Sequence, residues 1–257
     1  KKIKFDTLIV MWGYEYRMVK VFSILMGIKD IYFSPVDQNE VLKRNIAHKS
    51  ERHLKIVLKY LKINYDKNFI LDYKFDNISY FLKDRIISNN YIVYICGSGE
   101  TERYKRWSPG KYAKLAELIE VNHKNISIII IGSKDEKEIG DSIMKISNAK
   151  NIVNLSGKLN ENELKSILIN GMFAIGGDCG GMHIAKACGT KVVVMTGPTN
   201  ASLTAPIHTD LNIDKNMVGR PWYNKDSCKK NVNIVYDESM NFSVKEVYKK
   251  IIPYLYD

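Results

Sequence analysis

Long apolar runs are scarce in this 257-residue sequence. One of them, Ile126–Ile131, has the length of a strand and falls far short of the roughly 20 residues that a membrane-spanning helix needs. The start of the chain, Lys1-Lys2-Ile3-Lys4, has neither the apolar run nor the cleavage site of a signal peptide. It also lacks an initiator methionine. We therefore expect a soluble, cytoplasmic protein, and a sequence that is a fragment of a longer chain.

Cysteine is rare as well, with four residues: Cys96, Cys179, Cys188 and Cys228. They form no CxxC pair and no regular framework, whereas a metal site needs clustered ligands. No turn carries a DxD-like pair of carboxylates. We expect reduced thiols in the cytosol, no cofactor and no bound metal ion.

Acidic residues are outnumbered, 28 against 39 Lys and Arg, which gives a formal net charge of +11. Such a charge favours an anionic partner: nucleic acid, an acidic membrane or a phosphorylated substrate. Seven basic residues fall between Val41 and Lys62, where they suit either an anion-steering surface or an ordinary solvated helix face. Because they lack interleaved aromatics and no known module is present, we expect no nucleic-acid partner.

Two phosphate-binding motifs are missing. No GxxxxGK[ST] loop occurs, which excludes a Walker-type site. Gly97 and Gly99 match the start of a dinucleotide fingerprint, but Glu102 stands where the third glycine belongs and the next helix begins several residues late. The sequence therefore disfavours a nicotinamide cofactor.

What the sequence does contain is a regular alternation of strands and helices after residue 90. The strands are near-continuous apolar runs, which is typical of strands covered on both faces, so the pattern predicts an α/β fold with a parallel sheet between helices. The predicted strands are Tyr91–Ile95, Ser127–Ile131, Asn151–Leu155, Met172–Ile175 and Lys191–Met195. The predicted helices between them are Pro109–Asn122, Asp135–Ser147, Glu161–Asn170 and Gly181–Cys188.

The two ends of the chain are less regular. In the N-terminal part we expect strands at Thr7–Met11 and Ile31–Phe33 and helices at Tyr16–Met26 and Val41–Leu61. In the C-terminal part we expect a weak strand, Asn233–Tyr236, and a final helix, Ser243–Leu255.

Three glycine-rich turns follow predicted strands, and ligands of parallel sheets bind at the carboxyl ends of strands. The turn Gly97–Trp107 places backbone amides and the mobile charge of Lys105 where phosphate oxygens could lie. The turn Gly176–His183 enters a helix whose N-terminus suits an anion. The third turn is Thr196–Thr199. Each has a plainer interpretation: Asp178 as a helix cap, His183 as a packed histidine, and the last as a simple turn.

The order and spacing of five segments across about Tyr91–Pro206 resemble the bacterial lipopolysaccharide heptosyltransferases, glycosyltransferase family nine. These segments are Gly97-x-Gly99 with Lys105-Arg-Trp107, Gly132-Ser-Lys-Asp-Glu136, Gly157-Lys-Leu159, Asp178-Cys-Gly-Gly-Met-His183-Ile-Ala185 and Gly197-Pro-Thr199. The resemblance implies a fold of the GT-B type, with two facing Rossmann-like domains of which the N-terminal one is incomplete. The domains would be an acceptor-side domain at 1–88, a nucleotide-sugar domain at 89–236, and a helix at 237–257 that packs back on the first domain.

The resemblance also implies an activity, the inverting, metal-independent transfer of a heptose from a nucleotide-heptose, typically ADP-heptose. The acceptor would be an acidic or phosphorylated surface glycolipid, reached by peripheral contact with the inner face of the cytoplasmic membrane. The acidic general base would belong to an N-terminal segment of roughly 60 to 80 residues that we expect to be missing. Two alternatives stay open: a transferase with another nucleotide-sugar donor, and a catalytically silent nucleotide-binding module.

By position, the resemblance assigns roles to individual residues. Lys105 would pair with the donor diphosphate and Asp178 would contact the donor sugar, and these two are the candidate catalytic residues. Glu136 would hold the ribose hydroxyls, Leu159 would pack near adenine, and His183 would support the phosphate loop. The remaining candidates would line the phosphates with hydroxyls or amides: Ser98, Gly99, Thr101, Cys179, Gly180 and Gly181.

Overall fold

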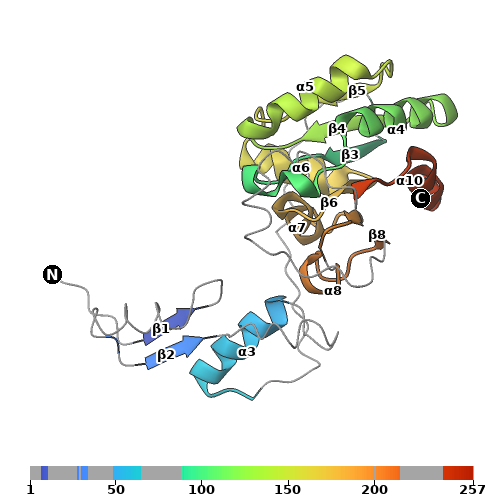
Figure 1. Cartoon of the computed structure of the whole chain (residues 1–257). Coiled ribbons are helices and arrows are strands. Elements are labelled where there is room, and N and C mark those ends of the chain that lie inside the picture. Colours follow the sequence, from blue (N-terminus) through green and yellow to red (C-terminus); the bar gives the residue numbers. More distant parts are fainter. Residues whose placement is uncertain are drawn as a thin grey trace. The chain divides into compact units, whose positions relative to one another are not determined.

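A computed structural model describes residues 7–10, 28, 30–33, 49–64, 88, 90–199, 201–214 and 240–256 of the chain (Figure 1). The chain divides into two compact units, Lys1–Asp72 and Tyr73–Asp257. In the described part of the chain, no helix is long and apolar enough to cross a membrane.

The first unit contains a pair of parallel strands. β1 (Thr7–Val10) pairs with β2 (Asp30–Phe33), which confirms the two strands predicted there. α3 (Lys49–Leu61) is the described part of the long amphipathic helix that we predicted from Val41. Residues 41–48, the predicted helix at 16–26 and the predicted strand at 233–236 lie outside the described residues.

The second unit is built on six parallel strands in the order β5-β4-β3-β6-β7-β8. The strands are β3 (Tyr91–Ile95), β4 (Ser127–Ile131), β5 (Ile152–Asn154), β6 (Phe173–Gly177), β7 (Val192–Thr196) and β8 (Leu211–Asp214). The chain starts in the middle of this sheet, works outward to β5, and returns to β6 on the other side of β3. This is the strand order of a Rossmann fold, whose direction reverses between β3 and β6.

Among the described residues, helices connect the strands of this sheet, and one further helix comes after the last strand. They are α4 (Pro109–Asn122), α5 (Lys137–Ile146), α6 (Glu161–Asn170), α7 (Gly180–Ala187), α8 (Ala201–Thr204) and α10 (Val244–Ile251). The described part of the chain also contains the 3-10 segments η2 (Glu100–Lys105), η3 (Lys134–Glu136) and η5 (Ile252–Leu255). The predicted bounds of α4 and α6 are confirmed. We did not predict η2, α8 or β8, which are short or only partly buried.

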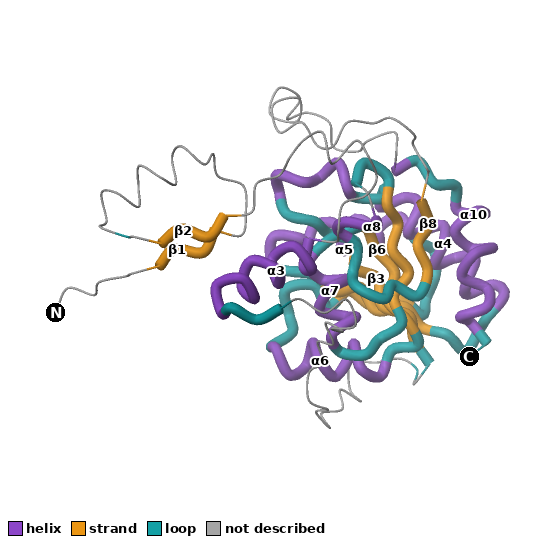
Figure 2. Tube along the Cα trace, turned by 90° about the horizontal axis from the view of Figure 1, so that it is seen from below, coloured by secondary structure: helices purple, strands orange, loops and turns teal. Residues whose placement is uncertain are grey.

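Helices cover both faces of the sheet, as the apolar strands predicted, because successive strand residues point to opposite faces. Ile92 and Tyr94 pack with α4, α5 and α10, whereas Val93 and Ile95 pack with α6 and α7. In Figure 2, α4 and α10 lie on the opposite side of the strands from α6 and α7. The sheet is therefore a rigid, fully covered platform for the turns at its carboxyl edge.

The carboxyl end of β6 differs from the prediction in a way that matters for the site. Gly176 and Gly177 belong to β6, although we had placed them in the following turn. A side chain at Gly176 would meet the carbonyl oxygen of Ile95, and one at Gly177 would lie 2.5 Å from the carbonyl oxygen of Lys105. These glycines therefore allow the backbone after β3 to lie directly against the end of β6.

The C-terminal segment packs inside the second unit. α10 lies against α4, and the buried Trp107 donates a hydrogen bond from Nε1 to the carbonyl oxygen of Phe242 at 3.0 Å. The final helix predicted at Ser243–Leu255 is present as α10 followed by η5. Its predicted contact with the N-terminal domain, like the predicted domain bounds, stays a prediction.

Candidate nucleotide-sugar site

The site is built where the direction of the strand order reverses. β3 and β6 are neighbours, and Ile95 is paired with Gly176 near their carboxyl ends. β3 runs into Cys96–Gly99 and η2, while β6 runs into Asp178 and the start of α7. In open parallel sheets, ligands bind in the crevice outside such a reversal. The first two glycine-rich turns recognised in the sequence are therefore brought together, as expected.

Lys105 is held between two carboxylates. Its Nζ lies 3.0 Å from Oε2 of Glu102 and 3.9 Å from Oδ2 of Asp178. The Lys105 side chain is 12% exposed and that of Asp178 is 5% exposed, so little water screens this pair. The mobile charge that we expected from the sequence is instead an oriented ammonium group on the boundary between the two turns.

Asp178 does not cap α7, in contrast to the plainer interpretation of this residue. Its Oδ2 accepts a hydrogen bond of 2.6 Å from the hydroxyl of Thr204, the last residue of α8. Cys179 is the N-cap residue of α7. The buried carboxylate is therefore oriented by a residue 26 positions away in the sequence.

The N-terminus of α7 begins with Gly180 and Gly181. No atom lies within 4 Å of the place that a Cβ of Gly180 would occupy, whereas Gly181 packs closely against Ile95. Burial raises the pKa of the neighbouring Cys179 thiol to about 11, so it is uncharged at neutral pH. A helix N-terminus with an open first residue and a neutral cap presents a partial positive charge without a competing anion from Cys179.

His183 also contacts α8. Its Nε2 lies 3.0 Å from the carbonyl oxygen of Thr204, which can only accept a hydrogen bond, so Nε2 is the donor. This contact agrees with the plainer interpretation of His183, that of a hydrogen-bonded histidine. It links α7 to α8 at the residue that also orients Asp178.

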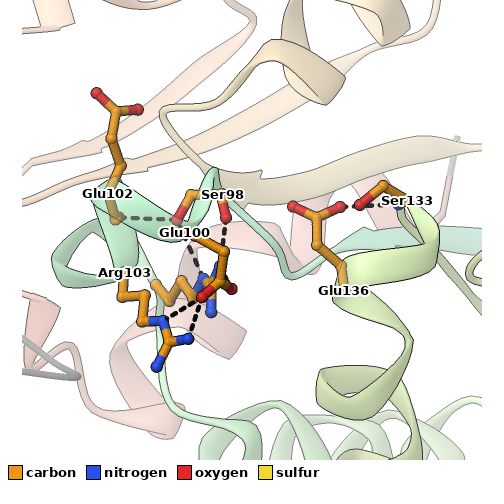
Figure 3. A network of polar contacts seen from close by, with 7 residues as sticks. Ser98, Glu100, Glu102, Arg103, Ser133 and Glu136 are labelled. Carbon is orange, nitrogen blue, oxygen red and sulfur yellow. Dashed lines mark hydrogen bonds and ion pairs between the residues drawn. The ribbon is translucent and has the colours of Figure 1, made fainter.

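Ser98 is engaged within its own turn (Figure 3). The hydroxyl of Ser98 donates to the carbonyl oxygen of Glu102 at 2.8 Å and accepts from Nε of Arg106 at 3.1 Å. Gly99 is exposed at the tip of the turn, and the side chain of Thr101 is not among those described. Arg106 is buried. Its importance for this turn could not be recognised from the sequence, because an isolated arginine has no distinctive spacing from other residues.

Glu136 reaches back over the start of its own helix, as Figure 3 shows. Its Oε2 accepts a hydrogen bond of 2.8 Å from the amide of Ser133, and the two residues form a capping box. Its carboxylate also lies against Gly97 and Gly132, which follow β3 and β4. Leu159 is half-buried and packs against the core on the α6–α7 face. Glu136 thus lies at the same carboxyl edge as Lys105.

No group of three or more His, Cys, Asp or Glu side chains is arranged to hold a metal ion within the described ranges. The two candidate acids, Glu136 and Asp178, follow different strands, β4 and β6. Each carboxylate has a protein hydrogen-bond donor as its partner.

Known proteins share both sequence and fold with this chain. The model of glycosyltransferase family 9 (heptosyltransferase) matches residues 26–232. Lipooligosaccharide heptosyltransferase 2 of Haemophilus influenzae is 30% identical over 125 residues, which cover 48% of this chain and 36% of that protein. The chain spans 35% to 36% of the length of the curated relatives that it matches.

Two solved structures extend the likeness over most of the fold. The Escherichia coli ADP-heptose lipopolysaccharide heptosyltransferase II has a TM-score of 0.65 and 15% identity, covering 97% of this chain and 76% of that one. The family 9 glycosyltransferase from Veillonella parvula has a TM-score of 0.68 and 17% identity, covering 91% of this chain and 65% of that one. The fold is thus that of the heptosyltransferase class of glycosyltransferases. The family match is more specific: this chain belongs to glycosyltransferase family 9.

Proposed function

We propose that this chain carries the donor-binding part of a heptosyltransferase. In the proposed reaction, a heptose moves from ADP-heptose to an acidic or phosphorylated lipopolysaccharide or surface-glycan acceptor, with inversion and without a metal ion. The observation that carries this proposal is the position of Lys105, 3.9 Å from Asp178, beside the open N-terminus of α7 in a family 9 chain.

The charges around Lys105 suit a sugar diphosphate. As the bond to the anomeric carbon breaks, negative charge develops on the departing diphosphate, and groups aimed at that charge lower the barrier. The ammonium group of Lys105 and the amides at the start of α7 would supply such groups. A site with these donors can neutralise the leaving group without Mg²⁺.

Asp178 suits the sugar rather than the phosphates. A buried carboxylate repels a phosphate but accepts hydrogen bonds from hydroxyl groups, and a heptose presents several of these. Lys105 and Asp178 would thus divide the donor between them, one at the diphosphate and one at the sugar. Ser98, Gly99, Thr101, Cys179, Gly180 and Gly181 would border the diphosphate, and His183 would support that loop through Thr204.

The other half of the donor would lie along the carboxyl edge toward β4 and β5. Glu136 follows β4, the second strand of the Rossmann order, from which an acidic side chain can bind ribose hydroxyls. Leu159 follows β5 and offers an apolar surface for a base. The E. coli structure described above is named for ADP-heptose, which supports adenine as that base.

The acceptor side is proposed from charge alone. α3 carries Lys55 and Lys59, both exposed, on an amphipathic helix. Such a surface would attract an anionic glycolipid or the anionic inner face of the cytoplasmic membrane. Binding of nucleic acid is not part of the proposal.

Nucleotide-dependent thermal stabilisation of the whole protein tests the proposal. A ligand that binds the folded state raises its stability by about 2.7 kcal/mol at a concentration of 100 Kd. We expect ADP to raise the melting temperature more than UDP or GDP, and ADP-heptose to be consumed when lipopolysaccharide acceptor is added. A larger shift with UDP or GDP would indicate another donor. A shift with ADP but no transfer would indicate a silent nucleotide-binding module.

A further inference from the structure

The carboxylate of Asp178 is fixed by a contact outside the glycine-rich turns. Thr204 donates its hydroxyl proton to Oδ2 of Asp178 at 2.6 Å. This length is typical of a hydroxyl that donates to an ionised carboxylate, which is among the stronger hydrogen bonds in proteins. The other described partner of Oδ2, Nζ of Lys105, lies farther away at 3.9 Å. Thr204 is therefore the closest group that sets the rotation of this carboxylate.

Thr204 is itself held in place by the helix that follows Asp178. Its carbonyl oxygen accepts a hydrogen bond of 3.0 Å from Nε2 of His183 on α7. Thr204 thus makes two contacts. Its hydroxyl contacts Asp178, two residues before α7, and its carbonyl oxygen contacts His183 within α7. A short helical turn of four residues has little stability of its own, so these contacts give it a defined position.

Both contacts are made by one of the two carboxylate oxygens. Within the described residues, Thr204 and Lys105 are neighbours of Oδ2. A carboxylate that binds sugar hydroxyls must present its oxygen in one direction, because misorientation weakens a hydrogen bond steeply. The hydroxyl of Thr204 supplies that orientation before the donor arrives.

We propose that Thr204 is a positioning residue for the donor sugar. It orients Asp178 through its hydroxyl and contacts neither the diphosphate nor the base. This inference rests on the proposed function, since it assumes that Asp178 contacts the sugar. It assigns to α8 a specific task, which is to distinguish a sugar-bearing nucleotide from the bare nucleotide.

The test compares two probes, ADP and ADP-heptose, by calorimetric titration of the whole protein. Thr204→Val keeps the shape of the side chain and removes the hydroxyl. We expect it to weaken ADP-heptose binding roughly 10-fold or more, because hydrogen bonds to charged groups are strong, and to change the Kd for ADP less than about threefold. Thr204→Ser, which keeps the hydroxyl, should recover most of the lost affinity.

Thr209→Val is the matched control. The hydroxyl of Thr209 also donates a hydrogen bond of 2.6 Å, but to the carbonyl oxygen of Pro206. Removal of the Thr209 hydroxyl should change stability to a similar extent as removal of the Thr204 hydroxyl. It should leave the affinities for ADP and ADP-heptose unchanged. Melting temperatures of all variants show whether each is folded.

The possible failures are distinguishable. If the wild-type protein binds neither probe, the proposed function is wrong and the role of Thr204 falls with it. If the wild-type protein binds both probes and Thr204→Val binds both as tightly, or loses both to the same extent, only the positioning role is overturned. A selective loss of ADP-heptose affinity, rescued by serine, supports that role.

Discussion

The ammonium group of Lys105 lies 3.9 Å from Oδ2 of Asp178 and thereby joins the turn after β3 to the turn after β6. The two residues are far apart in the sequence and meet because β3 and β6 are neighbours in the sheet. A cation and an anion so placed can bind two parts of one polar ligand.

Lys105→Ala should lower kcat/KM for the donor at least 100-fold, with kcat falling as well. Contacts that stabilise charge on a leaving group are worth roughly 3 to 4 kcal/mol. Steady-state kinetics with ADP-heptose and lipopolysaccharide acceptor would measure this. Lys165→Ala is the control, because Lys165 is similarly shielded at 15% exposure and pairs with Glu161 on α6. Turnover of Lys105→Ala at the wild-type level would remove Lys105 from the mechanism.

Glu136→Gln should weaken ADP binding about 5- to 10-fold while leaving stability almost unchanged. Glutamine can still accept from the amide of Ser133 in the capping box, but it replaces the charged acceptor proposed for ribose. Glu163→Gln is the control, since Glu163 forms an equivalent capping box with Asn160. Calorimetric titration with ADP would show the difference. Equal affinities for the two variants would restrict Glu136 to its capping role.

Gly177→Ala should destabilise the protein by about 1 to 3 kcal/mol, which is typical of an overpacked core position. Its methyl group would lie 2.5 Å from the carbonyl oxygen of Lys105, so either the end of β6 or the backbone at Lys105 must move. ADP affinity should fall with it. Gly110→Ala is the contrast: no atom lies within 4 Å of its Cβ position in α4, and alanine should stabilise that helix. Denaturant unfolding of both variants tests the difference, and an unchanged Gly177→Ala would contradict the close contact.

The half-buried Cys179 should make the protein less stable at alkaline pH. Burial raises its pKa from 9.0 to about 11, so the folded protein keeps a proton that the unfolded chain releases. The unfolded state thus binds fewer protons, and stability falls between pH 9 and about 11. Cys179→Ala should reduce this fall by on the order of 1 to 3 kcal/mol, measured by urea unfolding at pH 8 and pH 10.5. Parallel pH profiles for the two proteins would disprove the assignment.

Reversal of two charges on α3, with Lys55→Glu and Lys59→Glu together, should raise the KM for an anionic acceptor and leave the Kd for ADP unchanged. Exposed like charges repel an anionic ligand, and the effect should shrink at high salt. The control variant carries Lys145→Glu and Lys150→Glu, at two exposed positions of the second unit. It changes the net charge by the same amount. If both double variants raise KM alike, the effect comes from net charge and not from α3.

Local patterns were sufficient for much of the fold. The apolar runs at Tyr91–Ile95 and Ser127–Ile131 and the Ser108-Pro109 helix start predicted elements whose bounds the structure confirms. These predictions succeed because a strand that is buried on both faces of a parallel sheet must carry apolar residues along nearly its whole length. The failures are short elements such as α8 and β8, where four residues carry too weak a pattern, and the glycines of β6, whose role is to admit a neighbouring backbone.

The sequence by itself determined the kinds of elements, the glycine-rich turns that end the strands, and the residues able to bind an anion. Only the tertiary structure decided which of these meet: Lys105 with Asp178, Asp178 with Thr204, and Thr204 with His183. The physical reason is that hydrophobic periodicity and turn chemistry act over a few residues, whereas these contacts join residues that are distant in sequence. They are set by the order of strands in the sheet and by the packing of α7 and α8 at its edge.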